Sequence, residues 1–587
     1  MRKFTIKLVF LFFTFYIVHF TFYISTTFAI VDPLLVPNNR FGIHIIQATP
    51  QESSPAADLV NTNGDWGYIT VLVESKDRNH NKWQEFFNDL RRRHLIPLVR
   101  LATQPENGHW KLPYEGEEIA WADFLDKLNW PTKNRYIIIY NEPNHAAEWG
   151  NKVDATSYAK VLDKTITALK NKNGDFFVLN AGLDASTPYQ PPLYMDEVSF
   201  LKQMEQAVPG ILNRLDGWVS HSYPNPNFTG SPDDYGKGTV WTWEWEQEIL
   251  ESFGAKKKLP IFITETGWKH AEGLKPNKSY PSVEKVASYY QKAFTQCWNN
   301  PQIVAVTPFL LNYQEPPFDQ FSFKKHETKL AKSETQSIDD PYFPAYRVLQ
   351  DFPKASGRPV QEVKAELLKG EIFTSIVAGE AYMIDLTFKN IGQSIWNDRE
   401  QVRLVATEGG QNFGITNLEL PKNIKVEPGQ EYTFRLNLKA PLEMSARQNN
   451  VYKTTLNLFE GNRQFDSKPL ESETEVKSPV ILKIKSSLGW KNNFAGNYIL
   501  TIKGATGSNI QNIKLDGRGM SDAIEARYLL PDYSFEFSLE KPFYKPSKIT
   551  QTVSAGENTL NFGSLKPDIF SVLLNPKELW KLLPFSN

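Results

Sequence analysis

The chain has 587 residues, a length that predicts two to four folded domains. Its net charge of −1 and its pI near 6.8 exclude a general attraction to nucleic acid or to anionic membranes. The single cysteine, Cys297, excludes an intramolecular disulfide, and the nine scattered histidines show no zinc or calcium spacing. We therefore expect neither a metal nor a cofactor.

Residues 1–29 join a basic start to a long apolar run. Arg2, Lys3 and Lys7 precede LVFLFFTFYIVHFTFYISTTFA, which ends in small residues up to Ala29. This pattern predicts either a signal peptide cleaved after Ala29 or an uncleaved membrane anchor. Both alternatives predict an exported protein, secreted or tethered at the cell surface. Export without disulfides is more typical of bacterial than of animal proteins.

Short apolar runs alternate with amphipathic stretches between residues 38 and 353. The runs are FGIHII (41–46), YITVLV (68–73), LIPLVRL (95–101), RYIIIY (135–140), DFFVLNAG (175–182), GWVSHSY (217–223), LPIFITET (259–266) and VAVTPFLL (304–311). Expected helices between them include 82–94, 154–172 and 283–300. Alternating strands and helices predict a parallel sheet covered by helices, and eight units fit a closed (β/α)8 TIM barrel. An open doubly wound sheet is the alternative, but no Gly-rich phosphate loop follows the first run.

A glutamate lies at or just beyond the end of two of these runs. Glu142 lies two residues after the fourth run in RYIIIYNEPN, and Glu265 is the second-to-last residue of the seventh, in FITETGW. Active sites of such barrels lie at the C-terminal ends of the strands, and strands four and seven stand on nearly opposite sides of the mouth. Paired carboxylates across a bound substrate are the groups that hydrolyse glycosides. Their separation decides whether the anomeric configuration is retained or inverted.

The motifs Asn141-Glu142-Pro143 and Thr264-Glu265-Thr266-Gly267-Trp268 resemble those of glycoside hydrolase clan A, over residues 38–353. Families 5, 39 and 53 are all possible relatives. The resemblance implies that Glu142 is the acid/base, that Glu265 is the nucleophile and that Asn141 binds the sugar 2-hydroxyl.

The motif SHSYPNP, residues 220–226, resembles the end of strand six in the same clan. The resemblance implies that His221 orients the acid/base and that Tyr223 hydrogen-bonds the nucleophile. Residues 305–323 resemble the strand-eight region but lack its tryptophan, so Phe309 or Tyr313 is expected to cover that sugar subsite.

Four further features stay open or point to the core. Trp268 either stacks on a sugar or closes its loop, and Arg100 either binds substrate or forms a structural ion pair. His44 is expected in the core rather than in the site. The tryptophans of VWTWEWEQEIL, residues 240–250, are expected to pack a helix onto the barrel.

A different pattern begins after residue 353. We expect a linker over 354–366, and then strands in which apolar residues alternate with polar ones, as in YMIDLTFKN, residues 382–390. Residues 367–480 resemble the immunoglobulin-like four-tryptophan domain, although Trp396 is the only obvious tryptophan. Residues 481–565 predict a second small sandwich, similar to carboxypeptidase-regulatory-like or related bacterial surface modules, and 566–587 a C-terminal tail. The fold class is thus a multidomain chain, a (β/α)8 barrel followed by two all-β sandwiches.

These observations predict an exported, monomeric, retaining glycoside hydrolase whose partner is a poly- or oligosaccharide. The sandwiches either space the barrel or bind carbohydrate. The alternative is a non-catalytic cell-surface protein that binds glycan on a glycosidase-like barrel. An enzyme of phosphorylated metabolites is disfavoured, because it conflicts with export and no Gly-rich loop follows strands seven or eight.

Overall fold

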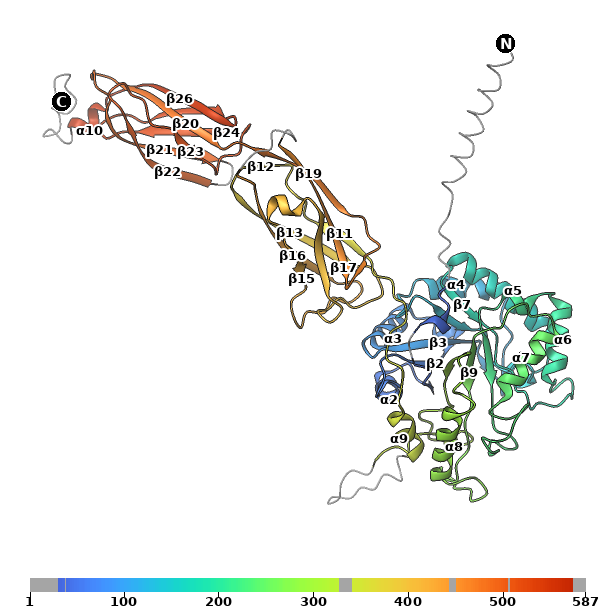
Figure 1. Ribbon diagram of the computed structural model, residues 1–587. Coiled ribbons are helices and arrows are strands. Elements are labelled where there is room, and N and C mark those ends of the chain that lie inside the picture. The colour runs from blue at the N-terminus through green and yellow to red at the C-terminus, as the bar shows by residue number, and fades with distance from the viewer. Residues whose placement is uncertain (1–29, 37–38, 327–339, 443–449, 505–506, 574–587) are drawn as a thin grey trace, which may run out of the picture. The chain divides into compact units, whose positions relative to one another are not determined.

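The computed structural model describes residues 30–36, 39–326, 340–442, 450–504 and 507–573 (Figure 1). The predicted signal peptide or anchor, residues 1–29, lies outside these ranges. Within them, no helix combines the length and the apolar character that crossing a membrane requires. The chain divides into two compact units, one up to Glu362 and one from Val363.

The first unit is built on eight parallel strands, counted over the described residues. They are β1 (Gly42–Ile45), β2 (Gly67–Glu74), β3 (Leu95–Ala102), β6 (Arg135–Ile138), β7 (Phe176–Leu179), β8 (Trp218–His221), β9 (Ile261–Glu265) and β10 (Ile303–Val306). They pair in the orders β1-β2-β3-β6-β7 and β8-β9-β10. Parallel bridges from Leu179 to Gly217 and from Phe41 to Val306 join the two sheets at both edges. The sheet therefore closes on itself, and the predicted barrel is confirmed.

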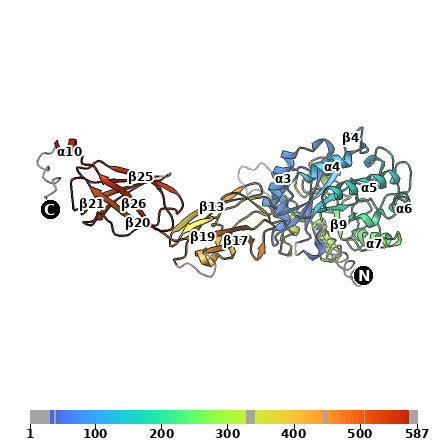
Figure 2. The same ribbon diagram turned by 90° about the horizontal axis from the view of Figure 1, so that it is seen from above.

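Helices follow the strands and lie on their outer side (Figures 1 and 2). They are α2 (Pro50–Asn61), α3 (His80–Arg92), α4 (Glu117–Asp126), α5 (Ala155–Lys172), α6 (Glu197–Ala207), α7 (Thr242–Ser252), α8 (Val283–Thr295) and α9 (Pro344–Asp351). Side-chain caps fix several starts: Asp154, for example, accepts a hydrogen bond from the backbone N–H of Ser157. Helix α8 ends before the expected residue 300, because the backbone N–H of the buried Trp298 bonds back to Ala293.

Strand side chains alternate between two cores. Residues such as Ile137 pack against the helices, whereas Tyr136 and Phe262 face the barrel interior with their ring centroids 5.4 Å apart. Phe177 completes this aromatic group, 5.7 Å from Phe262. The interior is filled with side chains, as in other barrels of this size, so polar groups gather where the strands end.

The second unit contains sheets in place of the barrel. A three-stranded sheet of β11 (Ala365–Lys369), β13 (Ala381–Asn390) and β16 (Glu431–Lys439) shares one buried cluster with a six-stranded sheet. That sheet contains β12 (Ser375–Val377), β14 (Val402–Glu408), β15 (Leu418–Glu419), β17 (Val451–Glu460), β18 (Arg463–Gln464) and β19 (Leu470–Lys477). Trp396 is completely buried in this cluster, 5.4 Å from the Phe465 ring, so it offers no binding surface.

A second buried cluster lies between the remaining two sheets. One contains β20 (Val480–Leu488), β23 (Ile524–Ala526) and β26 (Gly556–Leu565). The other contains β21 (Gly496–Gly504), β22 (Gly507–Leu515), β24 (Ser534–Glu540) and β25 (Ser547–Thr552). A short helix, α10 (Ile569–Leu573), follows. The sequence placed the linker over 354–366, but strand β11 already begins at Ala365, and the Gln361 side chain donates to the Pro131 carbonyl of the first unit.

Two glutamates are completely buried beside β8, Glu197 at the start of α6 and Glu246 on α7. Burial raises the pKa of Glu246 to about 7, although Ser220 and Trp218 act to lower it. Burial and the neighbouring charge of Glu246 raise the pKa of Glu197 well above its usual range. The pair is therefore most stable when it carries protons.

This pair makes stability depend on pH. The folded pKa of Glu246 lies above its ordinary 4.5, so its contribution is fully present below about pH 4.5 and is lost as the pH rises through about 7. We expect Glu246→Gln to lose less unfolding free energy than the wild type between about pH 5 and about pH 9, by on the order of 2–3 kcal/mol. Denaturant titration followed by tryptophan fluorescence measures this difference.

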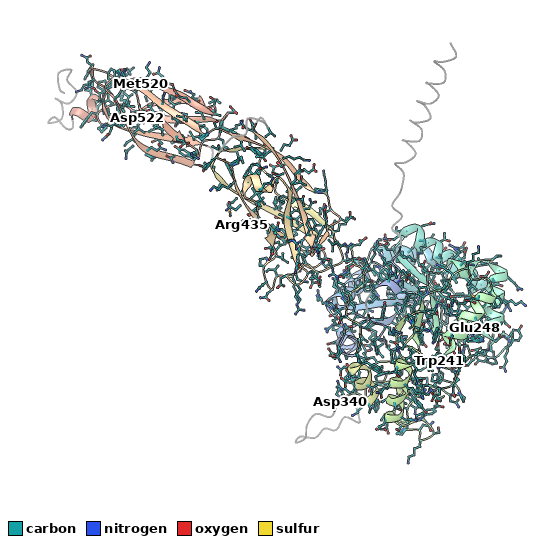
Figure 3. All side chains as sticks on the ribbon, viewed as in Figure 1. Trp241, Glu248, Asp340, Arg435, Met520 and Asp522 are labelled. Carbon is teal, nitrogen blue, oxygen red and sulfur yellow. The ribbon has the colours of Figure 1, made fainter. Side chains whose placement is uncertain are left out.

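Glu248→Gln is the matched control, because Glu248 lies exposed on the same helix (Figure 3). It should lose stability with rising pH as the wild type does. The same pH dependence in both variants would contradict the assignment.

Candidate active site

A cavity of about 540 Å³ opens at the C-terminal ends of the barrel strands. Its lining includes Arg100 from β3, Glu142 from the loop after β6 and Glu265 from the end of β9. This volume is typical of small-molecule sites, and polar groups converge there from several strands. The two glutamates singled out in the sequence therefore meet in one cavity.

The loop after β6 holds Glu142 in an unusual backbone conformation. Tyr140 and Glu142 have φ angles of 69° and 29°, in the left-handed region that side chains other than glycine rarely adopt. The Glu142 N–H donates to the carbonyl of Gly182 at 3.0 Å, and the His145 N–H donates to the Glu142 carbonyl at 2.9 Å. These bonds hold a strained turn that carries the carboxylate past the strand end.

His221 lies between the two glutamates. Its Nδ1 is 2.8 Å from Glu142 Oε1 and 3.9 Å from Glu265 Oε2. Burial opposes protonation, but the negative charges of Glu265 and Glu142 raise the pKa of His221. Gly182 makes this position possible, because a Cβ there would come within 2.2 Å of the His221 ring.

Glu265 is held as a carboxylate. Arg100 Nη1 lies 2.5 Å from its Oε1, and the Tyr223 hydroxyl donates to its Oε2 at 3.0 Å. Burial acts to raise the pKa of Glu265, but His221 and Arg100 outweigh it and lower the pKa to about 2. The contacts expected of His221 and Tyr223 are thus present, while their catalytic roles stay predictions.

Arg100 and Asn141 connect the nucleophile candidate to a third carboxyl group. Arg100 Nη1 also donates to Asn141 Oδ1 at 2.8 Å, and Asn141 Nδ2 donates to Glu148 Oε2 at 3.3 Å. Of the two alternatives left open for Arg100, the structure shows the ion pair, formed inside the cavity. Both ends of the Asn141 amide have protein partners, so its orientation is set before any ligand binds.

Sequence reasoning missed Glu148 and misplaced His44. Glu148 lines the cavity, where burial and the charge of Glu142 raise its pKa to about 7. It belongs to a short 3-10 helix, Ala146–Glu148, and no strand-end signal marks it. His44, expected in the core, is completely buried but also lines the cavity, with Nδ1 4.0 Å from Glu265 Oε1. Burial lowers the pKa of His44 to about 3.

A hydrogen-bonded pair of a histidine and an aspartate in the cavity lining was also missed. His145 Nε2 lies 3.0 Å from Asp184 Oδ2, and Thr187 donates to the same carboxylate at 2.7 Å. No motif in the sequence marks these residues, because the fold of the loop after β7 is what brings Asp184 next to His145.

Aromatic residues form one wall of the cavity. Phe309 and Tyr313 both line it, and so do Phe228, Phe318 and Phe321. The sequence named Phe309 or Tyr313 as the cover of a sugar subsite, and the structure places both where a ligand would contact them.

Trp268 does not line the cavity. Its side chain is almost completely buried, Nε1 donates to the Gly230 carbonyl at 2.8 Å, and its ring packs 5.0 Å from that of Tyr290. The structure therefore decides between the two alternatives for Trp268: the residue closes its loop. Stacking on a sugar is wrong, because the protein already covers both the ring and its N–H group.

One group of three metal-ligand types occurs among the described residues, and it is this same cluster. Glu142, His221 and Glu265 each offer a donor atom within 4.8 Å of the others. The Arg100 guanidinium already supplies positive charge to Glu265, which opposes a bound cation. The donor set thus fits a hydrogen-bonded carboxylate pair better than a metal centre.

Comparison with known proteins gives structural similarity only. No protein-family model and no curated protein matches the chain. One similar solved structure is a family 39 glycoside hydrolase from Bacteroides cellulosilyticus WH2, with 15% identity, 70% of this chain and 81% of that chain covered, and a TM-score of 0.37. Another is AbfB, a family 51 α-L-arabinofuranosidase from Bifidobacterium longum, with 11% identity, 70% and 98% coverage, and a TM-score of 0.36.

A third is GH5_18 from Streptomyces cattleya in complex with GlcNAc, with 14% identity, 58% and 84% coverage, and a TM-score of 0.36. These similar structures are glycoside hydrolases of clan A families, the clan that the two glutamate motifs resemble.

The buried Trp268 side chain should stabilise the folded barrel. Trp268→Ala should lower the free energy of unfolding by about 3–5 kcal/mol, because it empties a packed site and leaves the Gly230 carbonyl without its donor. Trp268→Phe keeps most of the apolar volume and should cost about 1–2 kcal/mol. Denaturant titration measures both, and an unchanged stability of Trp268→Ala would remove the residue from the core.

Proposed function

We propose that the protein is a retaining glycoside hydrolase that cleaves O-glycosidic bonds in a poly- or oligosaccharide. One observation carries the proposal: Glu142 and Glu265 present carboxylate oxygens within 4.8 Å of each other in one cavity. Retaining enzymes hold their two carboxyl groups about 5–5.5 Å apart, whereas inverting enzymes leave room for a water between them. The short separation supports a double displacement.

In the first step, Glu265 attacks the anomeric carbon while Glu142 donates a proton to the departing glycosidic oxygen. The bond to the leaving group breaks as the bond to Glu265 forms. In the second step, the Glu142 carboxylate takes a proton from water, and that water displaces Glu265 from the sugar. The contacts of Arg100 and Tyr223 support the role of Glu265, since they keep it ionised before it attacks.

His221 supports the role of Glu142. Its Nδ1 holds Glu142 Oε1 at 2.8 Å, so the acid/base faces the nucleophile in one rotamer. Because His221 also lies 3.9 Å from Glu265, it responds to the charge on both glutamates. We assign it a positioning role and not a role in proton transfer to the sugar.

The proposal also assigns a role to each part of the chain. Residues 38–353 form the catalytic domain, and 367–480 and 481–565 form accessory sandwiches that space the barrel or bind carbohydrate. Residues 1–29 direct export. The competing function is a glycan-binding protein without catalysis. It is disfavoured because binding alone does not require a buried carboxylate held ionised next to a second carboxylate.

Removing either carboxylate tests the assignment. Glu142→Gln and Glu265→Gln should each lower turnover of a natural glycoside at least about a thousandfold, since each removes a group that takes part in the chemistry. A screen of glycans with the full-length chain identifies the substrate, and initial rates on it give the effect. Exposed Glu248→Gln is the control and should keep wild-type rates. Near-normal turnover in either cavity variant would support the binding protein.

The stereochemistry of the product tests the double displacement. Proton NMR during early hydrolysis should detect the substrate's own anomeric configuration before mutarotation. With an aryl glycoside that has a good leaving group, Glu142→Ala should still form the glycosyl-enzyme, and added azide should release a glycosyl azide of unchanged configuration. If the inverted anomer forms first, the reaction is a single displacement and Glu265 is not the nucleophile.

A further inference from the structure

The charged residues that line the cavity differ in how their charges are balanced. Arg100 pairs with Glu265 at 2.5 Å, and Lys111 pairs with Glu106 at 2.7 Å. Lys269 lines the same cavity, yet among the described residues no carboxylate oxygen lies within 4.0 Å of its Nζ. Its positive charge is thus available to a ligand.

Aromatic rings surround this ammonium group. Lys269 Nζ lies 4.9 Å from the ring centroid of Phe228, 5.4 Å from that of Phe321 and 5.8 Å from that of Tyr280. The Lys269 backbone N–H donates to the Phe228 carbonyl at 3.1 Å, which fixes the start of the side chain. Ring faces attract a cation but accept no strong hydrogen bond. Within the part of the chain that the structure describes, the three N–H donors of the ammonium group therefore have no charged acceptor.

The charge of Asp319 acts on Lys269, but the Asp319 carboxylate also has a hydrogen-bond donor of its own. Burial lowers the pKa of Lys269, and the charge of Asp319 acts against this effect. Asp319, in the segment after β10, accepts a hydrogen bond at Oδ2 from the Leu274 N–H of the loop after β9, at 2.6 Å. Lys269 is therefore a partly desolvated cation at the wall of the cavity, and an anion that displaced the remaining water would bind it strongly.

Lys269 lies on the same side of the cavity as Glu265. It follows Glu265 by four residues in the loop after β9, and the rings beneath its Nζ also contact Tyr223. The ring centroids of Tyr223 and Phe228 are 4.9 Å apart, and those of Tyr223 and Phe321 are 6.0 Å apart. Tyr223 in turn donates to Glu265, so Lys269 belongs to the nucleophile side of the cavity.

We propose that Lys269 binds an anionic substituent, a carboxylate or a sulfate, on the sugar that Glu265 attacks. This inference rests on the proposed function and names its substrate class as acidic glycans. Both substituents present charged oxygens to the ammonium donors, while the anomeric carbon lies between Glu142 and Glu265. The aromatic wall then covers the apolar face of the same sugar ring.

Matched pairs of glycans test the proposal and separate the two anions. The full-length enzyme is assayed on uronic-acid polysaccharides and their carboxyl-reduced forms, and on sulfated polysaccharides and their desulfated forms. We expect kcat/KM at least about tenfold higher on the acidic member of one pair, as one charge-assisted contact allows. The pair that shows the preference identifies carboxylate or sulfate. Equal hydrolysis of both members in every pair would overturn the anionic subsite and leave the glycosidase standing.

Variants of two lysines locate the preference. Lys269→Met keeps the length of the side chain and should lower kcat/KM on the acidic glycan about tenfold or more, with little change on its neutral counterpart. Lys269→Arg should retain most of the preference, because it keeps the charge. Lys111→Met is the control: Lys111 lines the cavity but is paired with Glu106, so the ratio between the two glycans should stay at its wild-type value.

Binding separates a failure of this inference from a failure of the proposed function. Calorimetric titration of the same pairs into Glu142→Gln measures affinity without turnover. If no glycan is hydrolysed but the acidic members bind at least about tenfold more tightly, and Lys269→Met removes this difference, the anionic site stands and the hydrolase does not. If neither member of any pair binds, both proposals fail.

Discussion

The ion pair between Arg100 and Glu265 is the interaction on which the candidate site depends. Arg100 extends from β3 and Glu265 from β9, and these strands are not neighbours in either sheet. Only the closed barrel brings the two side chains together across its mouth. A buried carboxylate without a partner would take up a proton or destabilise the fold, so this contact makes an ionised Glu265 compatible with burial.

The same guanidinium organises the opposite side of the mouth. By donating to Asn141 as well, Arg100 connects the β9 carboxylate to the loop that carries Glu142 and Glu148. His221 connects the two glutamates directly. The carboxyl groups therefore differ in their surroundings although they share one cavity. Glu265 is paired with the Arg100 cation, and its pKa is lowered. Glu148 accepts a hydrogen bond from the Asn141 amide, and its raised pKa means that it takes up a proton more readily. Such contrasts within one site are typical of acid–base chemistry.

The geometry has a structural cost that the rest of the barrel offsets. Tyr140 and Glu142 adopt positive φ angles, and His221 packs so close to Gly182 that any side chain there would displace it. Filled cores on both sides of the strands hold these features in place. Strain at a cavity and tight packing below it indicate that the mouth is built for a ligand and the barrel interior for stability.

The sequence by itself determined the elements and the two principal glutamates. Apolar runs of strand length between amphipathic stretches indicate a parallel sheet covered by helices. A carboxylate that follows such a buried strand lies at the mouth of the barrel, because active sites form at the C-terminal ends of the strands. His221 and Tyr223 also lie at a strand end, but their roles were inferred from the resemblance of SHSYPNP to the strand-six motif of clan A. Alternation in residues such as Ile384 and Leu386 likewise indicated half-buried strands in the second unit.

Only the tertiary structure decided what the loops bring together. Glu148, Asp184 and Lys269 lie beyond strand ends, where no periodicity constrains them, and they line the cavity because of how each loop folds back. Trp268 follows Glu265 by only three residues, yet packing against the helix α8 side of the barrel turns it into the core. Local sequence specifies which face of a strand is buried. The partners of a loop side chain depend instead on distant segments, and these become neighbours only when the barrel closes.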